Sequence, residues 1–144
     1  MGSVTNVRLY DVLSTVSRDL VDALDADACG ISRAIGDMLI LVAEHSGEEG
    51  KTIQLGQGYL VSDYPETARV LSERAPRALT LDDTDVDPAE AAILRELGFG
   101  SLLMLPLVLQ GEPWGLVEVY RADPRPFSDE DARAAQDLLA RVLS

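Results

Sequence analysis

The most hydrophobic part of the chain is residues 101–121, which read SLLMLPLVLQGEPWGLVEVYR. Two runs rich in Leu and Val flank a short Gly-containing break, a pattern typical of a β-hairpin. No polar residue occurs from Leu102 to Leu109, so this strand should be covered on both faces, at the centre of a three-layer domain. Pro106 cannot donate a ladder hydrogen bond and indicates an edge or a bulge. Glu118 interrupts the second run, where a carboxylate needs a partner, a ligand or water.

Apolar residues spaced by three and four predict a helix at each end of the chain. The first spans about residues 7–24, and the last opens with Ser128 and Asp131 after two prolines. The predicted apolar stripes are Leu9, Val12, Leu13, Val16, Leu20 and Leu24 in the first helix, and Ala135, Leu138, Leu139 and Val142 in the last.

Shorter apolar segments complete the predicted sheet. Residues 28–35 and 38–43 form two strands joined across Gly36-Asp37, a good tight-turn pair. Residues 52–55 and 78–81 are candidates for two short strands. With the hairpin, they give a central, mostly antiparallel sheet of about six strands.

Capping signals predict two helices in the middle of the chain. Asp63 is the expected N-cap of one, with Glu66 three residues later as in a capping box. Asp87 caps the next helix, Pro88 occupies its first position, and Gly98 closes it. Helices segregated around an antiparallel sheet define an α+β class, here one domain over residues 1–144.

Composition narrows the function. The 25 acidic against 12 basic residues give a formal charge of −13, which repels phosphate backbones and argues against nucleic-acid binding. No apolar run reaches the length of a membrane span and no signal peptide is evident, so we expect no membrane association and a cytoplasmic location. Cys29 is the single cysteine, which excludes an internal disulfide framework and a Cys-rich zinc site.

Several segments in order resemble the GAF domain, a sensory module of many signalling proteins. They are LVSDYP at 60–65, GFGS at 98–101 running into LPL at 105–107, GEPWGL at 111–116, and FSDED at 127–131. The resemblance implies that the terminal helices pack on one face of the sheet. It also implies that the middle helices and loops enclose a small-molecule pocket on the other face. One fold hosts many functions, so the resemblance does not name a ligand.

The same resemblance suggests which residues face the pocket. Residues 62–65 resemble a stretch that lines the cofactor in bilin-binding members, and alternate hairpin residues face the ligand. Met104 then lies beside Glu118, which requires an odd-length loop at residues 110–112; a two-residue Gly111-Glu112 turn would put them on opposite faces. We favour the odd loop. The predicted ligand-binding residues are Asp63, Tyr64, Thr67, Leu71, Leu102, Met104, Glu118 and Tyr120.

Known cofactors of such domains do not fit the sequence. Bilin-binding members carry the chromophore on a cysteine of a pocket helix, and neither middle helix here contains Cys or His. Cys29 lies in an apolar strand, where a free cysteine behaves as a small hydrophobe. His45 stands at a strand end rather than in the deep apolar pocket that haem requires. The acidic loop at 82–87 departs from the calcium-loop pattern, so no covalent bilin, haem or metal is expected.

The charges around the predicted pocket limit the ligand. Acids at the starts of the middle helices satisfy the amide donors that would otherwise hold a phosphate, so we expect a neutral or cationic ligand. Tyr64, Tyr120 and Glu118 are its predicted polar contacts. Alternatively, Glu118 is a buried acid satisfied by a neighbour such as Arg121 or Tyr120.

Two functions fit these sequence features. The first is a sensor that binds a small molecule and signals to an output domain or partner. The second is a degenerate module for dimerisation or scaffolding, with its pocket filled by its own side chains. The sequence shows no nucleophile–base pair, so we do not expect an enzyme. A homodimer through the terminal helices is expected, with Tyr10, Val21 and Leu143 as a second apolar stripe.

Overall fold

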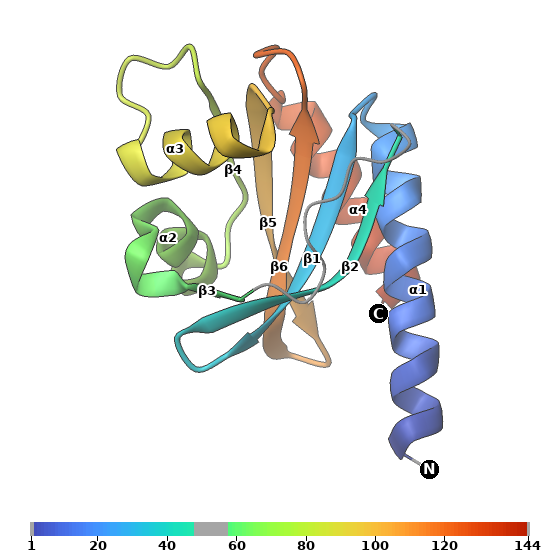
Figure 1. Ribbon diagram of the computed structural model, residues 1–144. Helices are drawn as coiled ribbons and strands as arrows, with labels where there is room; N and C mark the ends of the chain where they lie inside the picture. Colours follow the sequence, from blue (N-terminus) through green and yellow to red (C-terminus); the bar gives the residue numbers. More distant parts are fainter. Residues whose placement is uncertain (1, 48–57, 144) are drawn as a thin grey trace.

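The fold is an antiparallel sheet with helices on both faces (Figure 1). The structure is a computed structural model that describes residues 2–47 and 58–143, with side chains described from residue 8 onward. The predicted strand at 52–55 lies outside the described residues. The elements are α1 (Gly2–Ala23), β1 (Ala28–Ile35), β2 (Met38–Ser46), β3 (Gly58–Leu60), the 3-10 turn η1 (Val61–Asp63), α2 (Pro65–Glu73), β4 (Arg77–Thr80), α3 (Pro88–Leu97), β5 (Ser101–Leu109), β6 (Glu112–Arg121) and α4 (Asp129–Leu143).

Within the described residues, the six strands run in the order β3-β2-β1-β6-β5-β4, and each neighbouring pair is antiparallel. The predicted α+β class with about six strands is therefore confirmed. The first and last parts of the chain supply the central strands β1 and β6, so the two ends of the domain are joined through the middle of the sheet. None of the described helices is both long and apolar enough to cross a membrane.

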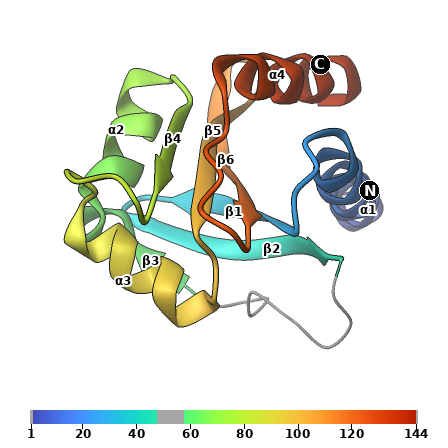
Figure 2. The same cartoon turned by 90° about the horizontal axis from the view of Figure 1, so that it is seen from above.

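Two separate apolar cores lie on the two faces of the sheet. α1 and α4 cover one face, and α2 and α3 cover the other, as Figure 2 shows. β6 serves both cores because its side chains alternate. Val117 and Val119 pack toward the terminal helices, whereas Leu116 and Tyr120 pack toward the middle helices. The predicted division of the helices between the two faces is confirmed.

The β5–β6 register places Met104 opposite Glu118 and Leu102 opposite Tyr120, as predicted. The predicted odd-length loop at residues 110–112 was wrong. The loop is the two-residue turn Gln110-Gly111, and both of its residues have positive φ. The extra residue comes instead from a register shift between Leu107 and Val108, which leaves Trp114 unpaired as a β-bulge. A two-residue turn of this kind suits the twist of the two strands. The bulged residue then brings Met104 and Glu118 to the same face of the sheet.

The start of α2 differs from the prediction. Asp63 lies in η1, and Tyr64 occupies the N-cap position without a side-chain capping bond. Proline disfavours helical geometry in the residue before it, so Pro65 fixes the first helical position and excludes Asp63 from the cap. Glu66 pairs with Arg77 of β4 rather than with the cap.

The other predicted caps are confirmed. Asp87 accepts hydrogen bonds from the amides of Ala89 and Glu90, and Gly98 closes α3 at φ 82°. Ser128 and Asp131 form a reciprocal capping box at the start of α4, with N···O distances of 2.9 and 3.1 Å.

Two apolar residues of the terminal helices lie elsewhere than predicted. Val21 is 6% exposed and belongs to the core, so it cannot form a second stripe on the outside of α1. Val142, assigned to the buried stripe of the last helix, is 44% exposed. Val21 packs into the core that α1 and α4 share with the sheet, whereas Val142 lies in the last turn of α4 and faces solvent.

Candidate functional site

A cavity lies between the sheet and the middle helices, on the face predicted for the pocket. Its free volume is about 30 Å³. One water molecule requires roughly 10–15 Å³ of such space, so the cavity accepts about two or three groups of that size. The sheet supplies its floor and α2, α3 and β3 supply its walls. The lining residues are Ser32, Leu39, Leu41, Tyr59, Tyr64, Thr67, Glu90, Ile93, Leu116, Glu118 and Tyr120.

Glu118 projects from β6 into this cavity. Its carboxylate accepts a hydrogen bond from the hydroxyl of Tyr120 at 3.1 Å. Although part of the residue is open to the cavity, protein atoms surround the carboxyl group. This desolvation, together with the nearby charge of Glu90, raises the pKa of Glu118 to about 7, and the Tyr120 hydrogen bond opposes the shift. Of the two neighbours predicted as possible partners for Glu118, Tyr120 is the one that fills this role.

A second carboxyl group, Glu90 of α3, lines the same cavity and is only 2% exposed. It accepts a hydrogen bond from the hydroxyl of Thr67 at 2.6 Å, and burial raises its pKa. From the sequence, Glu90 was predicted only as one of the acids at a helix start. Its position four residues before Leu94, on the buried side of α3, was the available signal for an inward orientation.

Three tyrosines line the cavity around the two acids. The rings of Tyr59 and Tyr64 meet edge to face, with centroids 6.1 Å apart and planes at 81°. Tyr120 stacks on Phe99 at 4.7 Å, which fixes its ring. Burial raises the pKa of each of the three hydroxyls, so all three are protonated donors at neutral pH.

The structure brings together part of the predicted ligand-binding set. Tyr64, Thr67, Glu118 and Tyr120 line the cavity. Met104 lies fully buried behind them, and the Thr67 hydroxyl approaches its sulfur at 3.5 Å. Leu102 is fully buried in the same core and does not line the cavity.

Asp63 and Leu71 lie outside this group. Asp63 is exposed in η1. Leu71 is half-buried beside a separate surface hollow that it shares with Ala34, and Val70 takes the fully buried position on α2. The spacing of Tyr64, Thr67 and Leu71 indicated a common face. In the structure, the buried face of α2 consists of Thr67 and Val70 instead, and Thr67 points toward Glu90.

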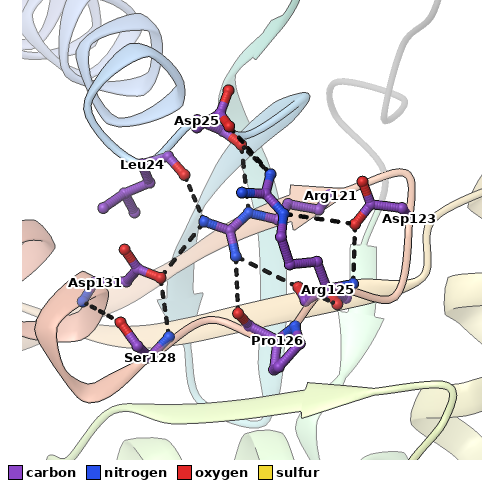
Figure 3. Close-up of polar contacts among 9 residues, drawn as sticks. Leu24, Asp25, Arg121, Asp123, Arg125, Pro126, Ser128 and Asp131 are labelled. Carbon is purple, nitrogen blue, oxygen red and sulfur yellow. Dashed lines mark hydrogen bonds and ion pairs between the residues drawn. The ribbon is translucent and has the colours of Figure 1, made fainter.

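Arg121 is the last residue of β6, and its side chain points to the face of the sheet that α1 and α4 cover (Figure 3). Its guanidinium is buried and donates to the carbonyl of Leu24 at 2.6 Å, to the carbonyl of Pro126 at 2.9 Å, and to Asp131 at 3.4 Å. It also lies 4.0 Å from the ring centre of Phe127. One side chain therefore connects the end of α1, the end of β6 and the capping box of α4.

Cys29 lies on the face of the sheet opposite the cavity, under α1 and α4. It is fully buried in the α1–α4 core, and desolvation raises the pKa of its thiol to about 12. At neutral pH it is a protonated, unreactive thiol. His45 does not line the cavity, and no group of three or more metal-ligating side chains occurs within residues 2–47 and 58–143.

The position of Cys29 predicts the effect of Cys29→Ala. We expect a loss of about 1 kcal/mol in the free energy of unfolding, because the change removes one buried heavy atom from a packed core. Urea denaturation measures this loss. Affinity for any ligand of the cavity should be unchanged, and a loss of ligand affinity in the folded variant would contradict the structural role assigned to Cys29.

A second prediction concerns pH and Glu118. Its pKa is raised from 4.5 to about 7 in the folded protein, so the folded state keeps a proton that the unfolded state releases. The contribution of Glu118 to stability should therefore fall as pH rises from 4.5 to 7, by up to about 3 kcal/mol. Glu118→Gln should remove this loss. The difference between the wild-type and variant unfolding free energies, measured from pH 4.5 to 8, should grow with pH, and a flat difference would contradict the assignment.

Comparison with known proteins places the chain in a family. A family model of the GAF domain matches residues 8–143. The phycoerythrobilin-bound GAF domain from a cyanobacterial phytochrome has a TM-score of 0.80 at 19% identity, covering 94% of this chain and 83% of that chain. The phycocyanobilin-bound GAF domain from a cyanobacterial phytochrome has a TM-score of 0.77 at 19% identity, covering 97% and 86%.

A third solved structure agrees with these two. The blue-light absorbing form of the Thermosynechococcus elongatus PixJ GAF-domain has a TM-score of 0.74 at 19% identity, covering 90% of this chain and 79% of that chain. A search of curated proteins found no match. Identity at this level shows a shared fold and leaves the ligand open. The match of the family model over nearly the whole chain shows that this protein belongs to the GAF domain family.

Proposed function

We propose that this domain is a non-catalytic sensor that binds a small neutral or cationic molecule in the cavity and signals to an output domain or partner. The observation that carries the proposal is the double role of β6. Glu118 and Tyr120 face the cavity, and the next residue, Arg121, holds both terminal helices. A ligand that shifts these cavity residues therefore acts on the strand that anchors α1 and α4.

The ligand proposed here is smaller than a bilin. The similar solved structures include domains bound to phycocyanobilin and phycoerythrobilin. Here the cavity measures about 30 Å³, far below the roughly 300–1,000 Å³ that encloses a drug-sized ligand. Cys29, the single cysteine of the sequence, lies in the core on the opposite face. A covalently attached chromophore is therefore not proposed.

The second candidate is a dimerisation or scaffolding module without a ligand. The small volume of the cavity favours it, because side chains of the domain fill most of the space. A groove between the β5–β6 hairpin and α4 offers an apolar surface that includes Val108, Leu139 and Leu143. α1 also projects beyond the sheet (Figure 1).

We predict a homodimer through the terminal helices under either function. Light scattering of the purified protein at micromolar concentration should give twice the mass of the chain. Leu143→Glu, which places a charge in the groove beside α4, should shift the protein toward the monomer. A monomer in the wild-type protein at tens of micromolar would contradict the prediction.

The two functions are separated by native mass spectrometry of the protein as purified. The sensor proposal expects a small molecule that is retained on the folded domain and released on unfolding, or a compound that raises the unfolding temperature. Its retention should depend on Thr67 and Glu118. If no molecule is retained and no compound in a broad screen stabilises the protein, the scaffolding function is the better explanation.

A further inference from the structure

We infer that the cavity is a site for a small organic ammonium cation, with its charge held between Glu118 and Glu90 and its carbon atoms against the tyrosine and leucine walls. The inference rests on the proposed sensor function and names the chemical class of its ligand. The cavity, its two carboxyl groups and its aromatic walls carry the argument.

The two carboxyl groups have no cationic partner within the described chain. Tyr120 and Thr67 each provide one hydroxyl donor, whereas a carboxylate can accept about four hydrogen bonds. No Lys, Arg or His belongs to the described lining of the cavity. A ligand cation would therefore supply the charge and the donors that the protein itself does not provide.

Nearby arginine side chains make their contacts outside the cavity. Arg77 pairs with Glu66, Arg33 stacks on Trp114 with its guanidinium 5.3 Å from the ring centre, and Arg121 points to the opposite face. None of these side chains lines the cavity. Among the described residues, no basic side chain is therefore placed to pair with Glu118 or Glu90 in the cavity.

The walls select an organic cation over a metal ion. Calcium and magnesium require about six or more oxygen ligands or retained waters. This cavity instead presents three tyrosine rings and the apolar side chains of Leu39, Leu41 and Leu116. Aromatic rings attract ammonium groups, and the apolar residues suit alkyl carbons. The acids also disfavour an anionic ligand.

The size of the cavity limits the part of the ligand that is enclosed. With about 30 Å³ of free volume, it accepts an ammonium group and one or two attached carbons. Tyr59, Tyr64 and Ile93 are partly exposed and form its outer side, where any further part of the ligand would lie. A primary amine or a small methylated ammonium is the class that fits.

Binding of a cation should depend on pH in a defined direction. Among the described residues, the titratable groups that interact with Glu118 are Glu90 from α3, Tyr59 from β3, Tyr64 before α2, Tyr120 from β6 and the buried thiol of Cys29 on β1, and none of them is a base that would charge near neutrality. A cation stabilises the carboxylate form, so binding must displace the proton held by Glu118. Affinity should therefore rise with pH up to about 7 and then level off.

The test is a titration of the full chain with methylammonium, dimethylammonium and ethanolammonium chlorides. Sodium chloride at equal ionic strength controls for salt, and acetamide serves as the neutral probe. Unfolding temperature and calorimetry report binding at up to about 100 mM, which detects millimolar affinity. Glu118→Gln removes the charge with little change of shape, and Glu112→Gln on the exposed start of the same strand is the matched control.

We expect at least one ammonium probe to raise the unfolding temperature of the wild type and of Glu112→Gln. Glu118→Gln should bind it at least about tenfold more weakly, and wild-type affinity should fall about tenfold for each pH unit below 7. The inference is overturned if no ammonium probe binds at pH 8, or if Glu118→Gln binds it equally well.

The outcomes also separate this inference from the proposed function. Binding of acetamide, or retention of a neutral molecule on the purified protein, without binding of any ammonium probe would overturn the cation class and leave the sensor function standing. If no probe binds and no molecule is retained, both proposals fail together.

Discussion

Replacing Arg121 with alanine is expected to lower the free energy of unfolding by about 3–5 kcal/mol. Arg121 is 3% exposed, and its guanidinium donates to the carbonyls of Leu24 and Pro126, at 2.6 and 2.9 Å. Alanine leaves these carbonyl oxygens without their donor and leaves Asp131 without its cation. It also removes the packing of the side chain over Phe127.

Two other variants make this expectation specific. Arg121→Lys keeps the charge but cannot reproduce the five-donor geometry of guanidinium, so it should lose an intermediate amount of stability. Arg125→Ala is the matched control, because Arg125 is half-exposed and its bond to Asp25 at 3.2 Å lies at the surface. It should cost less than about 1 kcal/mol. Urea denaturation followed by circular dichroism measures all three, and equal losses for the two alanine variants would contradict the role of Arg121.

The same residue tests the proposed route of the signal. Arg121→Lys should leave the cavity side of β6 intact, because Glu118 and Tyr120 point to the other face. Ligand affinity should then change little. The ligand-dependent change in amide exchange at the start of α4, near Ser128 and Asp131, should be reduced relative to the wild type. An unchanged response at α4 would argue that the signal reaches this helix by another path.

Local sequence signals predicted much of the fold because they act over a few residues. The Asp87 cap, the Gly98 stop and the capping box of Ser128 with Asp131 depend on side chains within three or four positions of the helix end. Strand β1 was predicted with its observed bounds because its apolar run ends at a Gly-Asp turn. The same local signals wrongly predicted Asp63 as the N-cap of α2. Pro65 disfavours helical geometry in the residue before it, so the cap position falls on Tyr64.

The cavity was harder to predict because its residues come from distant segments. Glu118 was found because a single acid in an apolar strand is conspicuous. Glu90 was missed, since an acid in the first turn of a helix is ordinary, and its inward orientation depends on how α3 packs on Thr67. Tyr59 lies in the three-residue strand β3, which is too short for a periodic pattern to predict which way its side chain points. Such side chains meet only through tertiary packing.

The hairpin places Met104 opposite Glu118, as predicted, but through a different local structure. The sequence offered a choice between an odd loop and an even loop. The structure has an even turn at Gln110-Gly111 and one bulged residue, Trp114. Bulges depend on strand curvature and on the neighbouring strand, and turn chemistry does not reveal them. The residue that follows the bulge, Gly115, lies close against the backbone of Ser32 and Arg33 in β1.

Replacing Gly115 with alanine should be among the most destabilising single substitutions, with a loss of about 3 kcal/mol or more. A methyl group there would overlap the carbonyl oxygen of Ser32, and would lie 3.0 Å from its carbonyl carbon and 3.2 Å from the Cα of Arg33. These are backbone atoms of β1 at the centre of the sheet, so no side chain can rotate away. A glycine in a strand interior often marks such close backbone approach.

Gly58→Ala provides the control, because a methyl group at that position meets its nearest atom, the sulfur of Met38, at 3.5 Å, an ordinary contact. It should change the unfolding free energy by less than about 1 kcal/mol. Relief of the clash in Gly115→Ala requires β1 and β6 to separate, and both strands line the cavity through Ser32 and Leu116. A variant that still folds should therefore bind any cavity ligand more weakly. Equal stability of the two alanine variants in urea would show that the contact between β1 and β6 is looser than the structure describes.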